Sequence, residues 1–120
     1  RARRSAELLV AVRRGAWARA QGLLEAGADA NACGAHGVSV LMHAARQGAA
    51  EAVAALLERR ADPNARDSPE SCSVLAHACR CTLPGAPAVV KALLEAAADP
   101  HATDASGRTP LMAAARNRRL

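Results

Sequence analysis

The sequence predicts an all-α solenoid of stacked helix-turn-helix units joined by hairpin-like turns. The first observation is an internal repeat, because the segment 27–32 (GADANA) returns as 60–65 (RADPNA), 33 residues later. The second is composition, since 33 residues are Ala while Trp17 is the single aromatic residue. Ala favours helices and lets them approach closely. A period of this length is typical of repeat arrays, in which each unit buries its apolar face on its neighbours.

Two helical segments are predicted in each complete copy. Residues 8–15 align with 41–48, again 33 residues apart, and later copies of this first-helix pattern begin at Leu75 and Leu111. The second segment of each complete copy carries a pair of leucines, which we expect to form the buried stripe of a second helix. These pairs are Leu23 and Leu24, Leu56 and Leu57, and Leu93 and Leu94.

Residues suited to helix ends and turns recur at matching places. Hydroxyl side chains precede the first helices and are expected to cap their free N–H groups. These residues are Ser5, Ser39, Ser73 and Thr109. Aspartates begin the turn that leads to the next unit and are expected to bond its backbone. They are Asp29, Asp62 and Asp99.

The copies also differ from one another. Gly27 is expected to end a helix in the left-handed conformation, but Arg60 and Ala97 stand in its place in the next copies. Those helices must therefore end differently or accept strain. The third copy is longer, with one extra residue within 68–72 and three more within 81–87. The second insertion is expected between the two helices of its unit, away from the turn tips, and is a second candidate contact site.

These motifs resemble the ankyrin repeat, with its first helix followed by Gly, its leucine pair and its G-A-D-x-N-A turn. The resemblance covers nearly the whole chain, as a single domain over residues 1–120. It divides this domain into approximately 4–33, 34–66, 67–103 and a partial copy, 104–120. It implies a binding module without active site or cofactor, whose partner lies on the concave surface formed by the first helices and the turn tips.

The resemblance also places the two positions before the glycine of each first helix in that groove. The first position is arginine in every copy: Arg13, Arg46, Arg80 and Arg116. Arginine grips carboxylates and phosphates through a planar fork, so this ladder indicates an acidic or phosphorylated peptide partner. The alternative is that these cations only stabilise the negative ends of helices. The second positions and the turn tips complete the candidate partner-binding set: Arg14, Gln47, His36, Val38, Arg66, Ser106 and Arg108.

Metal and nucleophile chemistry are disfavoured. His77, Cys79 and Cys81 offer three ligands within five residues, but residues two apart on a helix point roughly 200° away from each other. Structural zinc sites also favour C-x2-C pairs. Cys79 is interpreted as a small buried residue instead, and the repetition of His43 and His77 as that of a surface or interface residue. No metal, cofactor or catalytic residue is predicted, and the protein is not expected to be an enzyme.

Charge, hydropathy and cysteine content indicate the kind of partner and the cellular compartment that suit this chain. The net charge of +5 and the pI near 9.8 favour acidic or phosphate-bearing partners. No run of 18 apolar residues predicts a membrane span. The four cysteines show no disulfide framework and are interpreted as reduced thiols of the cytoplasm or nucleus. Nucleic acid is the weaker partner, because single-strand binders add aromatic stacking platforms that this sequence lacks beyond Trp17.

The sequence thus predicts a monomeric protein–protein interaction module that binds an acidic segment of another protein. Such a module serves as an adaptor, a scaffold or a regulatory domain. Two alternatives stay open: a basic surface for nucleic acid or phosphate, and a docking domain for a neighbouring enzyme domain. The chain has no initiator Met, so we expect it to be a piece of a longer protein.

Overall fold

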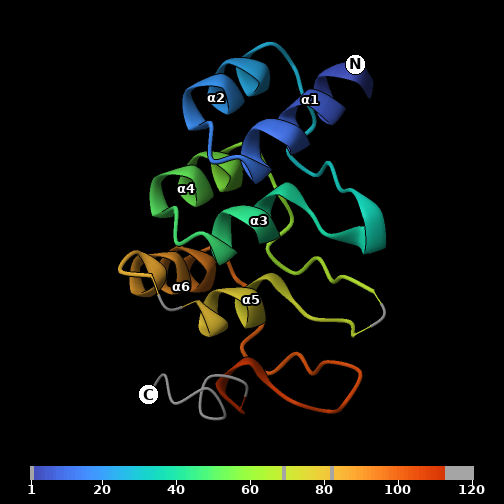
Figure 1. Ribbon diagram of the computed structural model, residues 1–120. Helices are drawn as coiled ribbons and strands as arrows, with labels where there is room; N and C mark the ends of the chain where they lie inside the picture. The colour runs from blue at the N-terminus through green and yellow to red at the C-terminus, as the bar shows by residue number, and fades with distance from the viewer. Residues whose placement is uncertain (1, 69, 82, 113–120) are drawn as a thin grey trace.

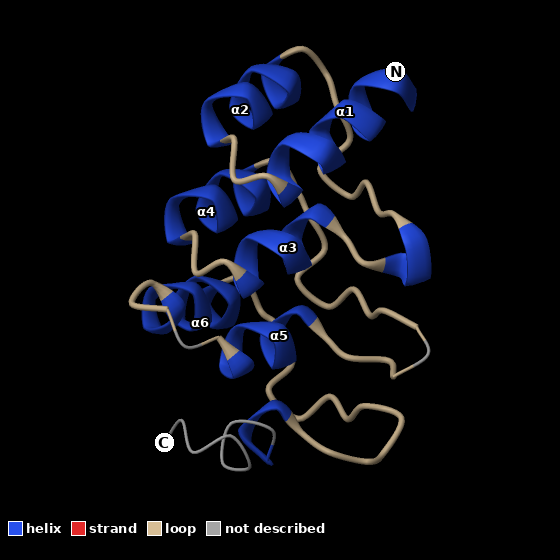
Figure 2. Cartoon of the chain, viewed as in Figure 1, coloured by secondary structure: helices blue, strands red, loops and turns tan. Residues whose placement is uncertain are grey.

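The structure, a computed structural model, describes residues 2–68, 70–81 and 83–112 as a column of helix pairs (Figure 1). The pairs are α1 (Ala2–Arg13) with α2 (Trp17–Glu25), α3 (Val40–Arg46) with α4 (Ala50–Glu58), and α5 (Val74–Arg80) with α6 (Ala86–Glu95). In these ranges the extended pairing is limited to two isolated antiparallel bridges, Cys33–Ser39 and Arg66–Ser73 (Figure 2). The all-α prediction is confirmed.

First helices stack on first helices, and the connecting turns project to one side of the column (Figure 1). Helix α3 lies between α1 and α5 and packs on both, while α4 packs on α6. Ala44 and Ala45 of α3 are completely buried, so small side chains permit this close approach as expected. The first helices and the turns therefore share one face of the molecule. The repeat boundaries and the single-domain assignment stay predictions.

The leucine pairs are less buried than predicted. One member of each pair belongs to the core: Leu24, Leu56 and Leu93. The other members are half-buried at Leu23 and Leu57, and Leu94 is 44% exposed. Consecutive helical residues point about 100° apart, so only one of two neighbours can face the core directly. The prediction that both leucines are buried is therefore wrong at Leu94, whereas Leu23 and Leu57 pack against the core from half-buried positions.

Hydroxyl caps are confirmed at the later first helices. The Oγ atoms of Ser39 and Ser73 each accept a hydrogen bond, at 3.1 Å, from the backbone N–H three residues ahead. Thr109 Oγ1 accepts one from the N–H of Met112 at 3.2 Å, where residues 110–112 begin a helix. These bonds satisfy N–H groups that have no partner within the helix.

Ser5 is not a cap, which corrects the prediction. Helix α1 already begins at Ala2, and the Ser5 hydroxyl accepts a hydrogen bond from the backbone N–H of Asp29 at 3.1 Å. In the next unit the same type of N–H, that of Asp62, donates to Oδ1 of Asn31 at 2.6 Å. Ser5 thus holds the first turn in the way that an asparagine holds the following one.

Helices α4 and α6 end in the same left-handed conformation as α2, although the residues at these positions are not glycine. Of the two alternatives, these helix ends therefore accept strain. Arg60 and Ala97 adopt positive φ angles of 67° and 70°, as Gly27 does at 102°. The left-handed conformation costs a residue with a side chain about 1–2 kcal/mol. Asparagine side chains hold both positions, because Asn31 Nδ2 donates to the Arg60 carbonyl at 3.1 Å and Asn64 Nδ2 to the Ala97 carbonyl at 3.3 Å.

The longer connection of the third unit lies between α5 and α6, away from the turn tips (Figure 1). It packs against the unit before it. A Cβ atom built on Gly85 would collide with the carbonyl oxygen of Gly48, in the turn between α3 and α4. Leu83 in the same connection is 48% exposed. The insertion therefore tightens the junction between two units at one end and presents an apolar side chain at the other.

Candidate functional site

Three of the four aligned arginines end neighbouring first helices. Arg13 lies in the last turn of α1, Arg46 in that of α3 and Arg80 in that of α5. Because α3 packs on both α1 and α5, the three residues follow one another along one face of the stack. Arg116 lies outside the described residues.

Arg13 and Arg46 form the open, basic part of this row. Both are exposed, and no other described residue forms a hydrogen bond or an ion pair with either guanidinium. His43 lies within their electrostatic reach. Burial lowers the pKa of His43 below its ordinary value of 6.5, and the charges of Arg46 and Arg13 lower it further. Arg14, next to Arg13, is also exposed.

Beside α5 lies a cleft of about 530 Å³. Its walls come from the end of α3, from the turn 67–72 and from α5. The lining residues are Arg46, Asp67, Glu70, Cys72, His77, Arg80 and Cys81. The cleft thus joins basic side chains to acidic ones, and the row of arginines is less uniformly positive than the sequence pattern alone indicates.

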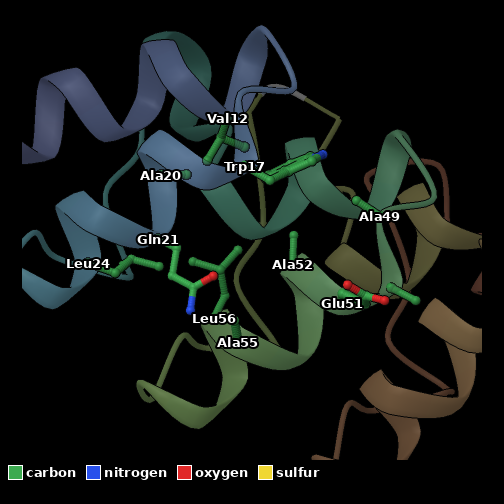
Figure 3. Close-up of a pocket in the computed structure, with 11 residues that line it drawn as sticks. Val12, Trp17, Ala20, Gln21, Leu24, Ala49, Glu51, Ala52, Ala55 and Leu56 are labelled. Carbon is green, nitrogen blue, oxygen red and sulfur yellow. The ribbon is translucent and has the colours of Figure 1, made fainter.

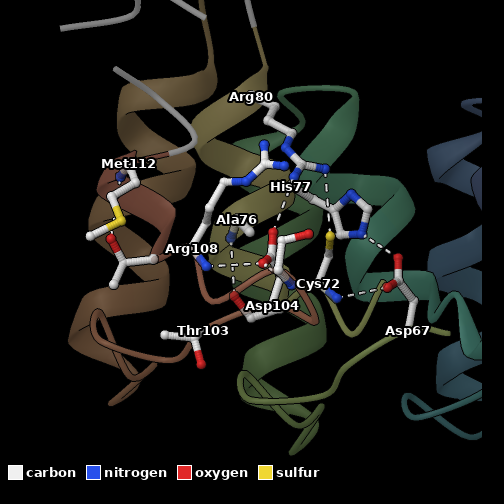
Figure 4. A network of polar contacts seen from close by, with 12 residues as sticks. Asp67, Cys72, Ala76, His77, Arg80, Thr103, Asp104, Arg108 and Met112 are labelled. Atoms are coloured by element: carbon white, nitrogen blue, oxygen red, sulfur yellow. Dashed lines mark hydrogen bonds and ion pairs between the residues drawn. The ribbon is translucent and has the colours of Figure 1, made fainter. Parts of the chain in front are cut away.

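Asp67 and His77 hold the turn of the third unit (Figure 4). Asp67 Oδ2 lies 2.9 Å from Nε2 of His77, and Asp67 Oδ1 accepts from the N–H of Cys72 at 2.8 Å. Both side chains are 10% exposed. Burial lowers the pKa of His77 although the bond to Asp67 acts to raise it. His77 is therefore a buried residue that supports the turn and not a surface residue; the alternative interpretation, an interface residue, stays a prediction.

Arg80 is already engaged within the chain (Figure 4). Its Nη1 donates to Cys72 Sγ at 3.5 Å, and its Nη2 lies 3.9 Å from Asp104 Oδ2. The backbone N–H groups of Arg108 and Ser106 donate to Asp104 Oδ1 at 3.0 and 2.8 Å. Chiefly the bond from Arg108 lowers the pKa of Asp104 below its ordinary value. Arg80 thus ties α5 to the next turn.

Two more candidate residues make contacts between units. The side-chain amide of Gln47 donates to the carbonyl of Val12 at 2.8 Å, at the end of α1. Arg66 Nη1 donates to the carbonyl of Thr103 at 2.9 Å, in the following turn. Sequence spacing gave no signal for these bonds, because the paired residues lie 35 and 37 positions apart. Partner contact by either residue stays a prediction.

The turn tips differ in what they present. His36 lies in the 3-10 helix η1 (Ala35–Gly37), is exposed and has a positive φ of 61°. Its carbonyl accepts from the N–H of Ser68 at 2.8 Å, so neighbouring tips are bonded to each other. Val38 is half-buried against the core. Ser106 is exposed, whereas Arg108 is half-buried.

The described residues bear on thiol and metal chemistry in two ways. Burial raises the pKa of the Cys72 and Cys79 thiols, which disfavours a thiolate nucleophile at neutral pH. Within 2–68, 70–81 and 83–112, no three His, Cys, Asp or Glu side chains are placed to hold a metal ion. No helix in those ranges has the length and hydropathy to cross a membrane.

Comparison with known proteins agrees with this architecture. A family model described as ankyrin repeats matches residues 8–104 in three copies. No curated protein matches the chain significantly. The match covers most of the chain and includes all of the helices from α2 to α6 and the second half of α1. The chain belongs to the ankyrin repeat family.

Proposed function

We propose that this chain is a protein–protein interaction module that binds an acidic or phosphorylated segment of its partner along the arginine row. Ankyrin repeats generally bind other proteins, on the extended surface that stacked units provide. The observation that supports an acidic ligand is the pair Arg13 and Arg46. They end successive first helices, are exposed, and are unpaired among the described residues.

The spacing of the helices suits an extended peptide. Stacked helices lie roughly 10 Å apart, and an extended chain advances about 3.3 Å per residue. Every third residue of the ligand therefore meets a new unit. A carboxylate or phosphate takes two parallel hydrogen bonds from a guanidinium, and Arg14 adds charge beside Arg13.

The cleft beside α5 indicates which part of the ligand lies over which helix. Arg80 is tied to Asp104 and Cys72, and the exposed Glu70 lines the same cleft. We therefore place the acidic residues of the ligand over α1 and α3, and a neutral or basic residue beside Glu70. This pattern of charges specifies a smaller set of ligands than general affinity for acidic chains would.

Peptide display with charge-matched variants tests this function. The groove variant is Arg13→Glu/Arg46→Glu. The control is Arg3→Glu/Lys91→Glu, which has the same net charge and changes exposed residues outside the groove. Circular dichroism verifies that both fold. Acidic peptides are expected with the wild type and the control, and not with the groove variant. Identical peptide sets from all three proteins would refute the acidic groove.

The net charge of +5 supports a phosphate-rich or nucleic-acid ligand as the second candidate. Binding of a single-stranded oligonucleotide would fall steeply with salt and decrease equally in both charge variants. Peptide recognition, in contrast, depends on particular side chains. We further propose an adaptor or scaffold role in the cytoplasm or nucleus, which the four free thiols support.

A further inference from the structure

A second hollow lies between the second helices α2 and α4 (Figure 3). These helices lie on the side of the column away from the turns (Figure 1). The volume of the hollow is about 430 Å³. Its walls come mainly from α2 and α4, and they include five alanines, among them Ala20, Ala52 and Ala55. Trp17 lines it as well and is half-buried. Cavities of this size are typical of small-molecule sites.

The alanines explain why the hollow exists. Helix α2 packs on α1 but makes little direct contact with α4, whereas α4 packs closely on α6. Helices α4 and α6 each bury a branched side chain completely, Val53 and Val89. At the α2–α4 junction five of the eleven lining residues are alanines, whose short side chains leave space between the longer ones. The cavity therefore results from the small size of the alanine side chains at this junction.

Two polar residues indicate which kind of ligand the hollow would bind. Most of the lining is apolar, but Glu51 and Gln21 lie in its wall and are exposed to solvent. The carboxylate of Glu51 can only accept hydrogen bonds and carries a negative charge at neutral pH. The side-chain oxygen of Gln21 is a second acceptor. An apolar body with a positively charged donor at one end complements this arrangement.

We propose that the α2–α4 cavity binds a small amphiphilic cation, an aromatic or aliphatic body that carries an ammonium group. The apolar part lies against Trp17 and the alanines, and the ammonium group meets Glu51 at the solvent side. This site uses none of the residues of the arginine groove, so it stands or fails independently of the peptide-binding function.

Three probes of the same shape and different charge test the proposal. They are 4-phenylbutylamine, 4-phenylbutan-1-ol and 4-phenylbutyrate. Trp17 is the only Trp, and the sequence has no Tyr, so its fluorescence reports binding without background from the protein. Chemical shifts of the backbone amides of α2 and α4 give the location. An exposed ion pair is worth up to about 1 kcal/mol, so the amine is expected to bind about two- to fivefold more tightly than the alcohol, and the carboxylate most weakly.

Matched variants isolate the residues. Glu51→Gln is expected to remove the preference for the amine and to leave binding of the alcohol unchanged. Glu58→Gln, on the same helix and outside the cavity, has the same net charge and should retain the preference. Ala52→Leu is expected to weaken all three probes at least about tenfold by filling the space. Ala54→Leu, at an exposed position of α4, should not.

Several results would overturn the proposal. One is equal affinity of the wild type for the three probes. Another is the same preference for the amine over the alcohol in Glu51→Gln and Glu58→Gln. The absence of any Trp17 or amide response at millimolar probe is a third. If Ala52→Leu does not fold, the two glutamate variants still decide the outcome, because they change only exposed side chains.

Discussion

The two junctions between successive second helices are built from related sequences and pack differently. Helices α4 and α6, which pack on each other, bury Val53, Val89 and Leu93 completely. Between α2 and α4, short residues such as Ala20 and Ala52 face a cavity of about 430 Å³. The first helices α1, α3 and α5 pack directly on one another in order. In an alanine-rich repeat protein, therefore, tight packing of one helical layer does not guarantee tight packing of the other.

Polar contacts connect the two units across the open junction. Gln47 donates to the Val12 carbonyl at 2.8 Å, and Arg59 Nη1 donates to the Leu24 carbonyl at 3.1 Å. Both bonds are second hydrogen bonds to carbonyl groups at the C-terminal ends of α1 and α2, which also accept from the N–H groups of Gly15 and Gly27. The closed junction has polar contacts too, since Asn64 Nδ2 donates to the Ala97 carbonyl at 3.3 Å, but it adds complete apolar burial and the contact of Gly85 with Gly48. The two junctions should therefore respond differently to the same kind of substitution.

The largest difference is expected from truncating one leucine at each junction. Leu93→Ala removes a completely buried side chain from the closed junction and should cost about 3–5 kcal/mol. Leu24→Ala removes one that is 4% exposed and already lines the cavity, so it loses fewer contacts and should cost about 2 kcal/mol. Urea unfolding measures both. Equal losses would show that the cavity is closed in solution.

A pair of glycine substitutions should act in opposite directions. Gly85→Ala places a methyl group against the Gly48 carbonyl and is expected to cost about 1–3 kcal/mol. Gly22→Ala, inside α2, meets nothing within 4 Å and should stabilise the chain by about 0.5–1 kcal/mol. Thermal unfolding measures the change in Tm for each variant, and the sign of that change shows whether the substitution destabilises or stabilises the chain. A neutral Gly85→Ala would mean that the insertion does not press on the preceding unit.

The local features of the fold could be predicted from the sequence. The caps at Ser39 and Ser73 and the turn at Asp62 depend on backbone groups two or three residues away, so their residue types identify them. The family resemblance places Arg13 and Arg46 in the groove for the same reason, since a helix end is a local property.

Features that join distant parts of the chain could not be predicted in this way. The cavity depends on which side chains of α2 and α4 face each other, and a leucine pair does not indicate that Ala20 and Ala52 line one cavity. The bond between Asp67 and His77 closes a turn within one unit, and that between Arg80 and Asp104 reaches into the next. Neither has a spacing that any motif specifies.

A smaller effect is expected at the strained ends of α4 and α6. Arg60→Gly and Ala97→Gly remove a side chain from a left-handed residue and should each stabilise the chain by about 0.5–1 kcal/mol. Because the strain is local, the two gains should be alike although the junctions differ. Gly27→Ala, the reverse change at the aligned position, should destabilise by about 1 kcal/mol. A gain at one end alone would contradict this account.

The smallest effect is expected on mild acidification, and it concerns the third unit. Burial holds the pKa of His77 below its ordinary value of 6.5. Below pH 6.5 the unfolded chain therefore takes up a proton that the folded chain resists. The stability that this residue contributes is complete above pH 6.5 and is lost as the pH falls toward its folded pKa. The Tm should decrease between pH 7 and pH 5.

Replacing His77 by Gln separates this titration from the structural role of the side chain. The amide of Gln still offers a donor to Asp67 but cannot take up a proton in this range. His77→Gln should therefore lower the Tm little at pH 7 and reduce its decrease between pH 7 and pH 5. The part that persists belongs to His43, whose pKa is also lowered by burial. His36→Gln, at an exposed turn tip, is the control. If both variants show the same decrease, His77 is not the residue that makes the third unit sensitive to acid.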